Sequence, residues 1–169
     1  DLSRVGGSAH KISEKELKKQ KYDAPDQALY SVPGVYIRQE DGYGLRPNIG
    51  LRGANSDRSK KVTLMEDGLL FGPAPYSAPA AYYFPLMTRL TGMDVIKGPA
   101  AILYGPQTIG GALNLFTRDL PRRGHAGAAD LSYGLHNYSK VHAHHGWSGS
   151  RGGFLVEGVN LMTDGFKEI

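Results

Sequence analysis

Histidines are concentrated in one short segment, and imidazoles are side chains that readily bind metal ions. The sequence reads His-Ala-His-His from 142 to 145, so an extended strand places His142 and His144 on one face and His145 on the other. A zinc site needs three or four ligands with defined neighbours. No carboxylate or fixed second shell is evident beside these histidines, so we predict no metal site and leave the role of His142, His144 and His145 open.

The sequence shows no residue pattern that is typical of a catalytic site. Glu66 and Asp67 are adjacent, and neighbouring side chains on a strand point to opposite faces, so they cannot serve one substrate together. Asp67-Gly68 instead predicts a turn. The chain has no cysteine, no G-x-S-x-G and neither G-x-G-x-x-G nor G-x-x-x-x-G-K-[ST]. We predict no enzyme activity and no cofactor, since a hydrolase would need a nucleophile that is not evident here.

Charge and composition restrict the class of protein. The net charge of +4 comes from 20 basic and 16 acidic residues, with much of the excess in Lys11 to Lys21 and Arg118 to Arg123. Neither cluster alternates with aromatic residues, which favours solvated surface over a nucleic-acid partner. The 23 glycines and 10 prolines follow no fixed period and indicate a loop-rich fold. The sequence contains no run of 18 or more apolar residues, so it predicts no transmembrane helix.

The elements that position these residues are short. Ser13 and Glu16 form a capping-box pattern that begins a helix over 13–20, and Pro25 suits the start of a second helix that ends at Pro33-Gly34. The segments 42–48 and 71–85 are irregular and long enough to carry function. Short strands are predicted at 8–12, 35–38, 49–53, 61–68, 92–98 and 111–118.

The chain changes character after Pro121. Segments of about ten residues alternate in polarity, with Ala129, Leu131 and Tyr133 on one face of the first. In the second segment Val141, Ala143 and Trp147 lie opposite Lys140, His142 and His144. This pattern is typical of transmembrane β-strands, although an ordinary sandwich sheet gives nearly the same one. The last residues stop within the pattern and the first show no secretory leader, so we expect a piece of a longer protein.

Three motifs carry a family resemblance: SVPGVYIRQ at 31–39, IGLRGANSDRSKKVTLMEDGLL at 49–70 and VIKGPAAILYGPQTIGGALNLFTR at 95–118. Their order and spacing resemble the plug of TonB-dependent outer-membrane receptors, over about residues 8–118. The segments FGPAPYSAP at 71–79 and YGPQTIGG at 104–111 look more like the ferric-citrate branch of this family than the cobalamin branch. The resemblance implies an α+β fold: a small mixed-sheet plug with short helices and long loops over 1–121, followed by the first antiparallel strands of a transmembrane β-barrel over 122–169.

The same resemblance implies function. The plug would be the gate of an outer-membrane transporter that binds a scarce substrate, a ferric chelate of siderophore or citrate type. The TonB energy-coupling protein would displace it, and iron would be present only as cargo. The alternative is a soluble periplasmic or secreted ligand-binding module without a transport role.

Site residues are also implied by the resemblance. Arg52 and Lys97 occupy positions where the family has plug cations that pair with carboxylates of the barrel wall, although Lys97 replaces the usual arginine and so offers no bidentate fork. The outward loops, 39–48 and 71–83, would bind the ligand through Tyr43, Arg46, Tyr76, Tyr82 and Tyr83. These residues suit a hydroxamate or carboxylate chelate that is anionic or rich in oxygen. Glycines such as Gly110 and Gly111 would let the plug strands approach their neighbours closely.

Overall fold

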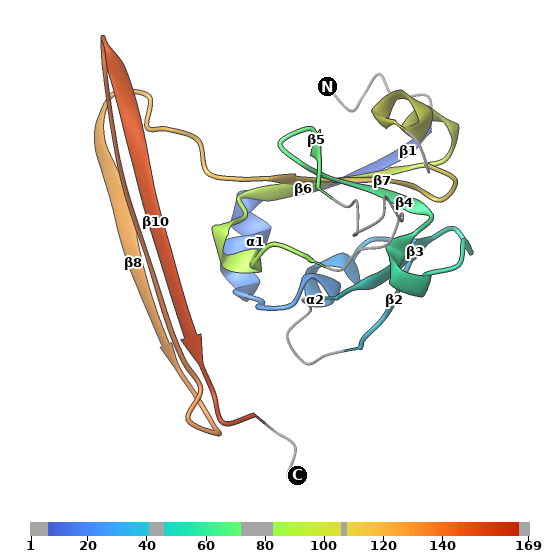
Figure 1. The fold of residues 1–169 in the computed structure, drawn as a ribbon, viewed down its shortest axis with the longest axis horizontal. Coiled ribbons are helices and arrows are strands. Elements are labelled where there is room, and N and C mark those ends of the chain that lie inside the picture. Colours follow the sequence, from blue (N-terminus) through green and yellow to red (C-terminus); the bar gives the residue numbers. More distant parts are fainter. Residues whose placement is uncertain (1–6, 41–45, 72–82, 106–107, 166–169) are drawn as a thin grey trace. The chain divides into compact units, whose positions relative to one another are not determined.

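The computed structural model describes residues 7–40, 46–71, 83–105 and 108–165 (Figure 1). The chain divides into two compact units, Asp1–Arg118 and Asp119–Ile169. The domain boundary predicted from the sequence lies after Pro121. Among the described residues, no helix is long and apolar enough to cross a membrane.

A five-stranded mixed sheet organises the first unit. Its central strands are buried along most of their length, because apolar and β-branched side chains fill both faces. The strand order is β1 (Ser8–Ile12), β6 (Gly92–Lys97), β7 (Gly111–Phe116), β4 (Val62–Glu66) and β5 (Leu69–Leu70). The β4–β7 pair is parallel and the other pairs are antiparallel.

Short helices and a second small sheet complete this unit. The predicted capping box is confirmed at α1 (Glu14–Gln20): the Glu16 amide donates to the Ser13 hydroxyl at 3.4 Å, and the Ser13 amide donates to the Glu16 carboxylate at 2.7 Å. The predicted second helix is present as α2 (Pro25–Leu29), although it ends at Leu29 and not at Pro33-Gly34. The remaining elements are the antiparallel pair β2 (Val35–Arg38) and β3 (Asn48–Leu51), and the 3₁₀ helices η2 (Asp57–Ser59), η4 (Met87–Arg89) and η5 (Pro99–Tyr104).

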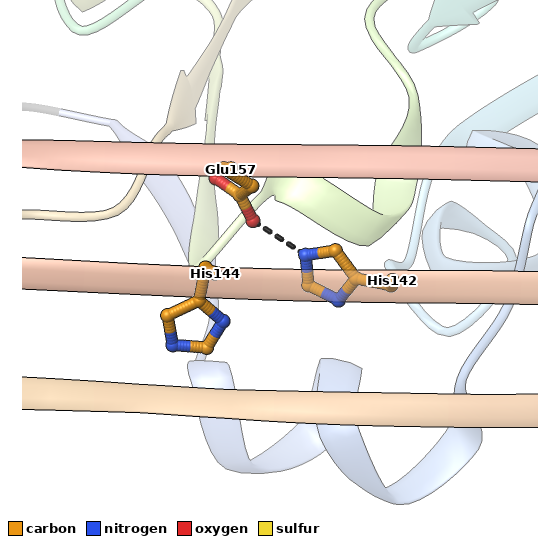
Figure 2. Close-up of side chains that lie close together, drawn as sticks. All are labelled: His142, His144 and Glu157. Atoms are coloured by element: carbon orange, nitrogen blue, oxygen red, sulfur yellow. Dashed lines mark hydrogen bonds and ion pairs between the residues drawn. The ribbon is translucent and has the colours of Figure 1, made fainter.

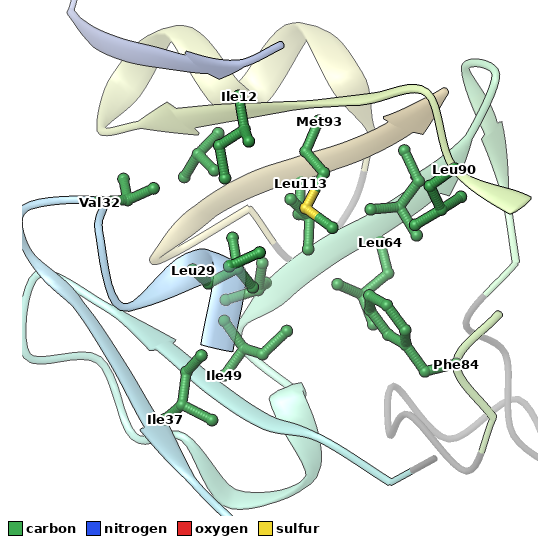
Figure 3. Close-up of a cluster of buried hydrophobic side chains, with 14 of the residues drawn as sticks. Ile12, Leu29, Val32, Ile37, Ile49, Leu64, Phe84, Leu90, Met93 and Leu113 are labelled. Carbon is green, nitrogen blue, oxygen red and sulfur yellow. The ribbon is translucent and has the colours of Figure 1, made fainter. Parts of the chain in front are cut away.

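The hydrophobic core joins these layers. Figure 3 shows Leu29 of α2 and Ile49 of β3 meeting side chains of the five-stranded sheet, among them Leu113. Burying a side chain of this size contributes about 1.5–3 kcal/mol relative to exposing it. The core therefore fixes the small sheet and α2 against the large one.

Glycine allows a close approach at the start of β7, as predicted. Gly111 has φ +148°, and a Cβ at this position would lie 2.2 Å from the Ile96 carbonyl oxygen and 2.6 Å from the Leu51 Cδ1. No side chain fits at such distances. The predicted turn at Asp67-Gly68 is also confirmed, with φ values of +50° and +81°.

Several predicted strands end earlier than expected, since 61–68 ends at Glu66, 92–98 at Lys97 and 111–118 at Phe116. The end of the strand predicted over 49–53 is wrong in a way that matters for a site residue. The strand expected over 49–53 stops at Leu51, and the chain turns through Arg52 and Gly53 with φ values of +50° and +79°. The Ala54 amide closes this turn by donating to the Leu51 carbonyl at 3.0 Å. Arg52 therefore lies in a left-handed turn and not within a strand.

The second unit is an antiparallel sheet of three long strands. Its order is β10 (Gly152–Met162), β9 (Ser139–Gly149) and β8 (Gly124–Tyr133). The predicted alternation is confirmed, since Val141 and Ala143 are exposed while Lys140 and His142 on the other face are buried. One face of the sheet is thus mainly apolar, and the other carries the histidines at 142 and 144.

Candidate functional site

Two predicted cations meet at the Pro33-Gly34 turn. Lys97 ends β6 with a side chain that is only 5% exposed, and its Nζ donates to the Pro33 carbonyl oxygen at 2.7 Å. The Arg52 main-chain amide donates to the adjacent Gly34 carbonyl oxygen at 2.9 Å. The structure therefore brings Arg52 and Lys97 together around one turn, although they are far apart in sequence.

The guanidinium of Arg52 lies over Gly98, the residue after Lys97. A Cβ at Gly98 would stand 2.8 Å from the Arg52 Nη1, so glycine leaves the room that the guanidinium occupies. Burial lowers the pKa of Lys97, and the positive charge of Arg52 lowers it further. Within the described part of the chain, no ion pair is found for either cation. Two neighbouring positive charges thus lack a carboxylate within the described residues.

The predicted ligand residues are only partly described. Tyr43, Tyr76 and Tyr82 lie outside the described residues, whereas Arg46 is exposed and Tyr83 is 56% exposed.

The Tyr83 ring packs against Phe71, which in turn packs against Phe84. It packs edge-on against Phe71 with ring centroids 6.4 Å apart, and Phe71 packs in the same manner on the buried Phe84 at 6.0 Å. Such a stack fixes an aromatic side chain in a defined position while leaving more than half of it accessible. Tyr83 can therefore present both a ring face and a hydroxyl to a ligand.

The histidines of β9 lie beside a carboxylate that we did not predict. The His142 Nε2 and the Glu157 Oε1 are 2.6 Å apart, and the His142 and His144 rings stack with centroids 5.7 Å apart (Figure 2). One donor atom from each of the three residues falls within 4.8 Å of the other two. We predicted no metal site because no carboxylate was evident near these histidines. Glu157 shows that this premise is incorrect.

His145 is separated from this cluster, as its parity predicts. It lies on the apolar face, where its Nε2 is 3.2 Å from the His125 Nδ1 and its ring packs near Phe154. Trp147 packs against the same Phe154 ring with centroids 6.3 Å apart. The His-Ala-His-His segment thus supplies two different environments, one polar and one aromatic.

Comparison with protein families gives one assignment for most of the chain. The model of the TonB-dependent receptor plug domain matches residues 1–112. The vitamin B12 transporter BtuB of Vibrio cholerae is 29% identical over 107 residues, which are 63% of this chain and 17% of that protein. BtuB of Vibrio vulnificus strain YJ016 is 26% identical over 139 residues, which are 82% of this chain and 22% of that protein.

Solved structures resemble both units. The unliganded ferric citrate transporter FecA superimposes with a TM-score of 0.75 at 26% identity, covering 95% of this chain and 26% of that one. The copper transporter OprC superimposes with a TM-score of 0.70 at 20% identity, covering 92% of this chain and 24% of that one. The chain therefore spans about a quarter or less of the length of these relatives.

Proposed function

This chain belongs to the TonB-dependent receptor plug domain family, and we propose that it is the gate of an outer-membrane transporter that takes up a ferric chelate. The family and its relatives are transporters and receptors, not enzymes. The observation that carries the proposal is the likeness to FecA, which extends over 95% of the chain and includes the strands after the plug. A soluble binding module would bury the apolar face of such a sheet in its core, whereas Leu131, Tyr133 and Val156 are exposed here.

A ferric chelate is the substrate class that the ligand residues suit best. Ferric citrate and siderophore complexes are oxygen-rich, and most are anionic. Arg46 would supply a guanidinium for carboxylate or hydroxamate oxygens, and Tyr83 would supply a supported ring and a hydroxyl. The proposed ligand set also retains Tyr43, Tyr76 and Tyr82. Vitamin B12, the substrate named for BtuB, is the competing cargo and becomes an outcome of the test.

Arg52 and Lys97 are proposed to lock the plug to the barrel wall. Two cations side by side repel each other, and the buried Lys97 has lost most of its hydration. A carboxylate supplied by the rest of the barrel would relieve both costs, because opposite charges in a partly dehydrated interface attract strongly. The Lys97 ammonium already donates to Pro33, so such a contact would also hold the Pro33-Gly34 turn.

TonB is the proposed source of the work that opens the gate. The plug is built from short strands and tight turns, so a local rearrangement breaks few contacts at a time. Pulling from the periplasmic side could therefore displace part of the plug without unfolding the whole hydrophobic core. The outer membrane is the proposed location, as the receptor family implies.

A binding titration on the full-length receptor tests the substrate class. The purified receptor would be titrated with ferric citrate, a ferric hydroxamate siderophore, a ferric catecholate siderophore and cobalamin. We expect one ferric chelate to bind with a Kd of about 1 µM or tighter. Arg46→Ala should weaken the affinity for this chelate at least about tenfold, since a hydrogen bond to a charged group contributes about 1.5–3 kcal/mol.

The control for this titration is Arg122→Ala, which removes an exposed arginine outside the proposed ligand loops. It should leave the affinity unchanged. Tight binding of cobalamin with no binding of any ferric chelate would reject the substrate class while leaving the family assignment intact.

A further inference from the structure

The polar face of the β8–β10 sheet carries an arrangement of donors that the gate function does not require. We propose that His142, His144 and Glu157 bind one divalent transition-metal ion of the Zn²⁺ class. These residues all belong to the second unit, so the proposal rests neither on the plug nor on the identity of the transported substrate.

The strand register is what brings the three donors together. Glu157 lies directly opposite His144 in the β9–β10 ladder, and opposite residues have Cβ atoms about 5 Å apart. His142 is two residues before His144 on β9, so both imidazoles project from the same face. Figure 2 shows the Glu157 carboxylate extending from β10 to His142, with His144 alongside on β9.

The distances fit a site that closes on an ion by small side-chain movements. The donor atoms are already within 4.8 Å of one another. Two ligands of one tetrahedral Zn²⁺, each at about 2.0–2.1 Å from the metal, stand about 3.3 Å apart. The His142–Glu157 pair at 2.6 Å would open slightly and His144 would move inward, which rotation about the χ angles can supply.

Burial and charge favour a cation at this position. His142 is 4% exposed, and the side chain of Glu157 is 17% exposed. Glu157 is also the one charged residue of β10, and its neighbours on the same face are Leu155 and Val159. A buried carboxylate is stabilised when it is paired, as Glu157 is with His142, or when it is bound to a metal. An ion held by the carboxylate and both imidazoles would stabilise all three.

Other charged groups on this face are consistent with a dication. Asp130 of β8 lies directly opposite His142, and Lys140 precedes His142 by two residues on β9. With neutral imidazoles, the charges of Asp130, Glu157 and Lys140 sum to −1 − 1 + 1 = −1. A divalent ion changes this local charge to +1, whereas the same site without its two acidic residues would carry +1 + 2 = +3.

The ligand types select the class of metal. Two imidazoles and one carboxylate suit Zn²⁺, Co²⁺, Ni²⁺ or Cu²⁺, whereas Ca²⁺ and Mg²⁺ prefer oxygen ligands alone. Three protein ligands on one face of a sheet leave at least one coordination position for water or another ligand. The site is therefore expected to keep an open coordination position and not to form a closed structural centre.

Metal titration of the full-length receptor tests this proposal. Receptor stripped with a chelator would be titrated with Zn²⁺ by calorimetry and, in parallel, with Co²⁺ by visible absorption, because Co²⁺ reports its coordination geometry. We expect His144→Ala and Glu157→Gln each to weaken one Zn²⁺ site by at least about tenfold, the lower end of the loss known for residues that only support metal ligands. Glu157→Gln keeps the size of the side chain and a hydrogen-bonding group beside His142, so it guards against a loss through misfolding.

His145→Ala is the matched control, because it removes the neighbouring imidazole from the opposite face of the same strand. It should leave Zn²⁺ affinity and the Co²⁺ spectrum unchanged. Equal Zn²⁺ binding by the wild type, His144→Ala and Glu157→Gln would overturn the proposal and leave the His142–Glu157 contact as a hydrogen bond alone. Loss of binding in His145→Ala would also overturn it and would place the ion near His125.

Discussion

The ammonium of Lys97 donates to the main-chain oxygen of Pro33 at 2.7 Å, across a sequence separation of 64 residues. The contact joins the end of β6, an inner strand of the five-stranded sheet, to the turn that precedes β2. Arg52 binds the next carbonyl of the same turn through its main-chain amide. A displacement of this turn must therefore disturb both cations at once, which is why we place the lock of the plug here.

Removing these cations should make the plug easier to displace. In the full-length receptor, Lys97→Ala is expected to speed hydrogen exchange of plug amides at least about tenfold, since breaking a buried charged contact costs about 3–5 kcal/mol. Arg52→Ala should act in the same direction with a smaller effect, because its side chain is exposed. Hydrogen–deuterium exchange with mass spectrometry measures both.

Lys18→Ala is the control for the lock variants. Lys18 is a cation on the surface of α1 with a 66% exposed side chain, and within the described part of the chain it forms an ion pair with Glu14 of its own helix and no other. Exposed pairs of this kind contribute about 0.3–0.5 kcal/mol. If Lys97→Ala and Arg52→Ala exchange no faster than Lys18→Ala, the lock assignment is wrong.

Asp94 should destabilise the plug sheet at neutral pH. Burial raises its pKa above 3.8, and the opposite charge of Lys11 offsets this only in part. Among the described residues, the Oδ1 has no hydrogen-bond partner. Because the folded state holds this proton more tightly than the unfolded state, stability increases as pH falls from above the raised pKa towards 3.8. Asp94→Asn should remove that dependence and increase the exchange protection of β6 amides at pH 7.

The test of Asp94 compares exchange protection at pH 7 with that at about pH 4, near the ordinary pKa of an aspartate. After correction for intrinsic exchange rates, the wild type should gain protection in β6 at the lower pH and the Asn variant should not. Reduced protection of the Asn variant at pH 7 would contradict the assigned burial cost.

A side chain at position 111 should disrupt the sheet. Gly111→Ala places a Cβ against the Ile96 carbonyl and the Leu51 side chain, so we expect a loss of about 2–4 kcal/mol from overpacking and backbone strain. Gly68→Ala is the comparison, because Gly68 also has a positive φ but no atom within 4 Å of the added Cβ. Its cost should be about 1 kcal/mol. Equal losses in local exchange protection would show that the close contacts at Gly111 are not limiting.

The local elements of the plug follow from short sequence patterns. The Ser13–Glu16 capping box and the Asp67-Gly68 turn depend on residues that are neighbours in the chain, and both are present. The end of β3 does not follow in this way. The alternation Ile49-Gly50-Leu51 continues to favour a strand through Arg52, whereas the observed turn is closed by a hydrogen bond from Ala54.

Long-range contacts could not be predicted from single segments. The Lys97–Pro33 bond depends on the packing of β6 beside the turn before β2, which no local pattern encodes. The Glu157–His144 pairing could have been found, because a tight turn between Gly149 and Gly152 pairs residues whose numbers sum to 149 + 152 = 301, and 144 + 157 = 301. The signal was the hairpin register and not the histidine motif.

Energy-dependent uptake tests the gate function most directly. The full-length protein would be expressed in cells that lack their own ferric-chelate receptors, and accumulation of radioactive iron would be measured with and without TonB. We expect ferric-chelate uptake that requires both the receptor and TonB, with the receptor recovered in the outer membrane. Uptake that is equal without TonB, or a receptor recovered only in the soluble fraction, would contradict the proposal that this chain is a TonB-driven gate.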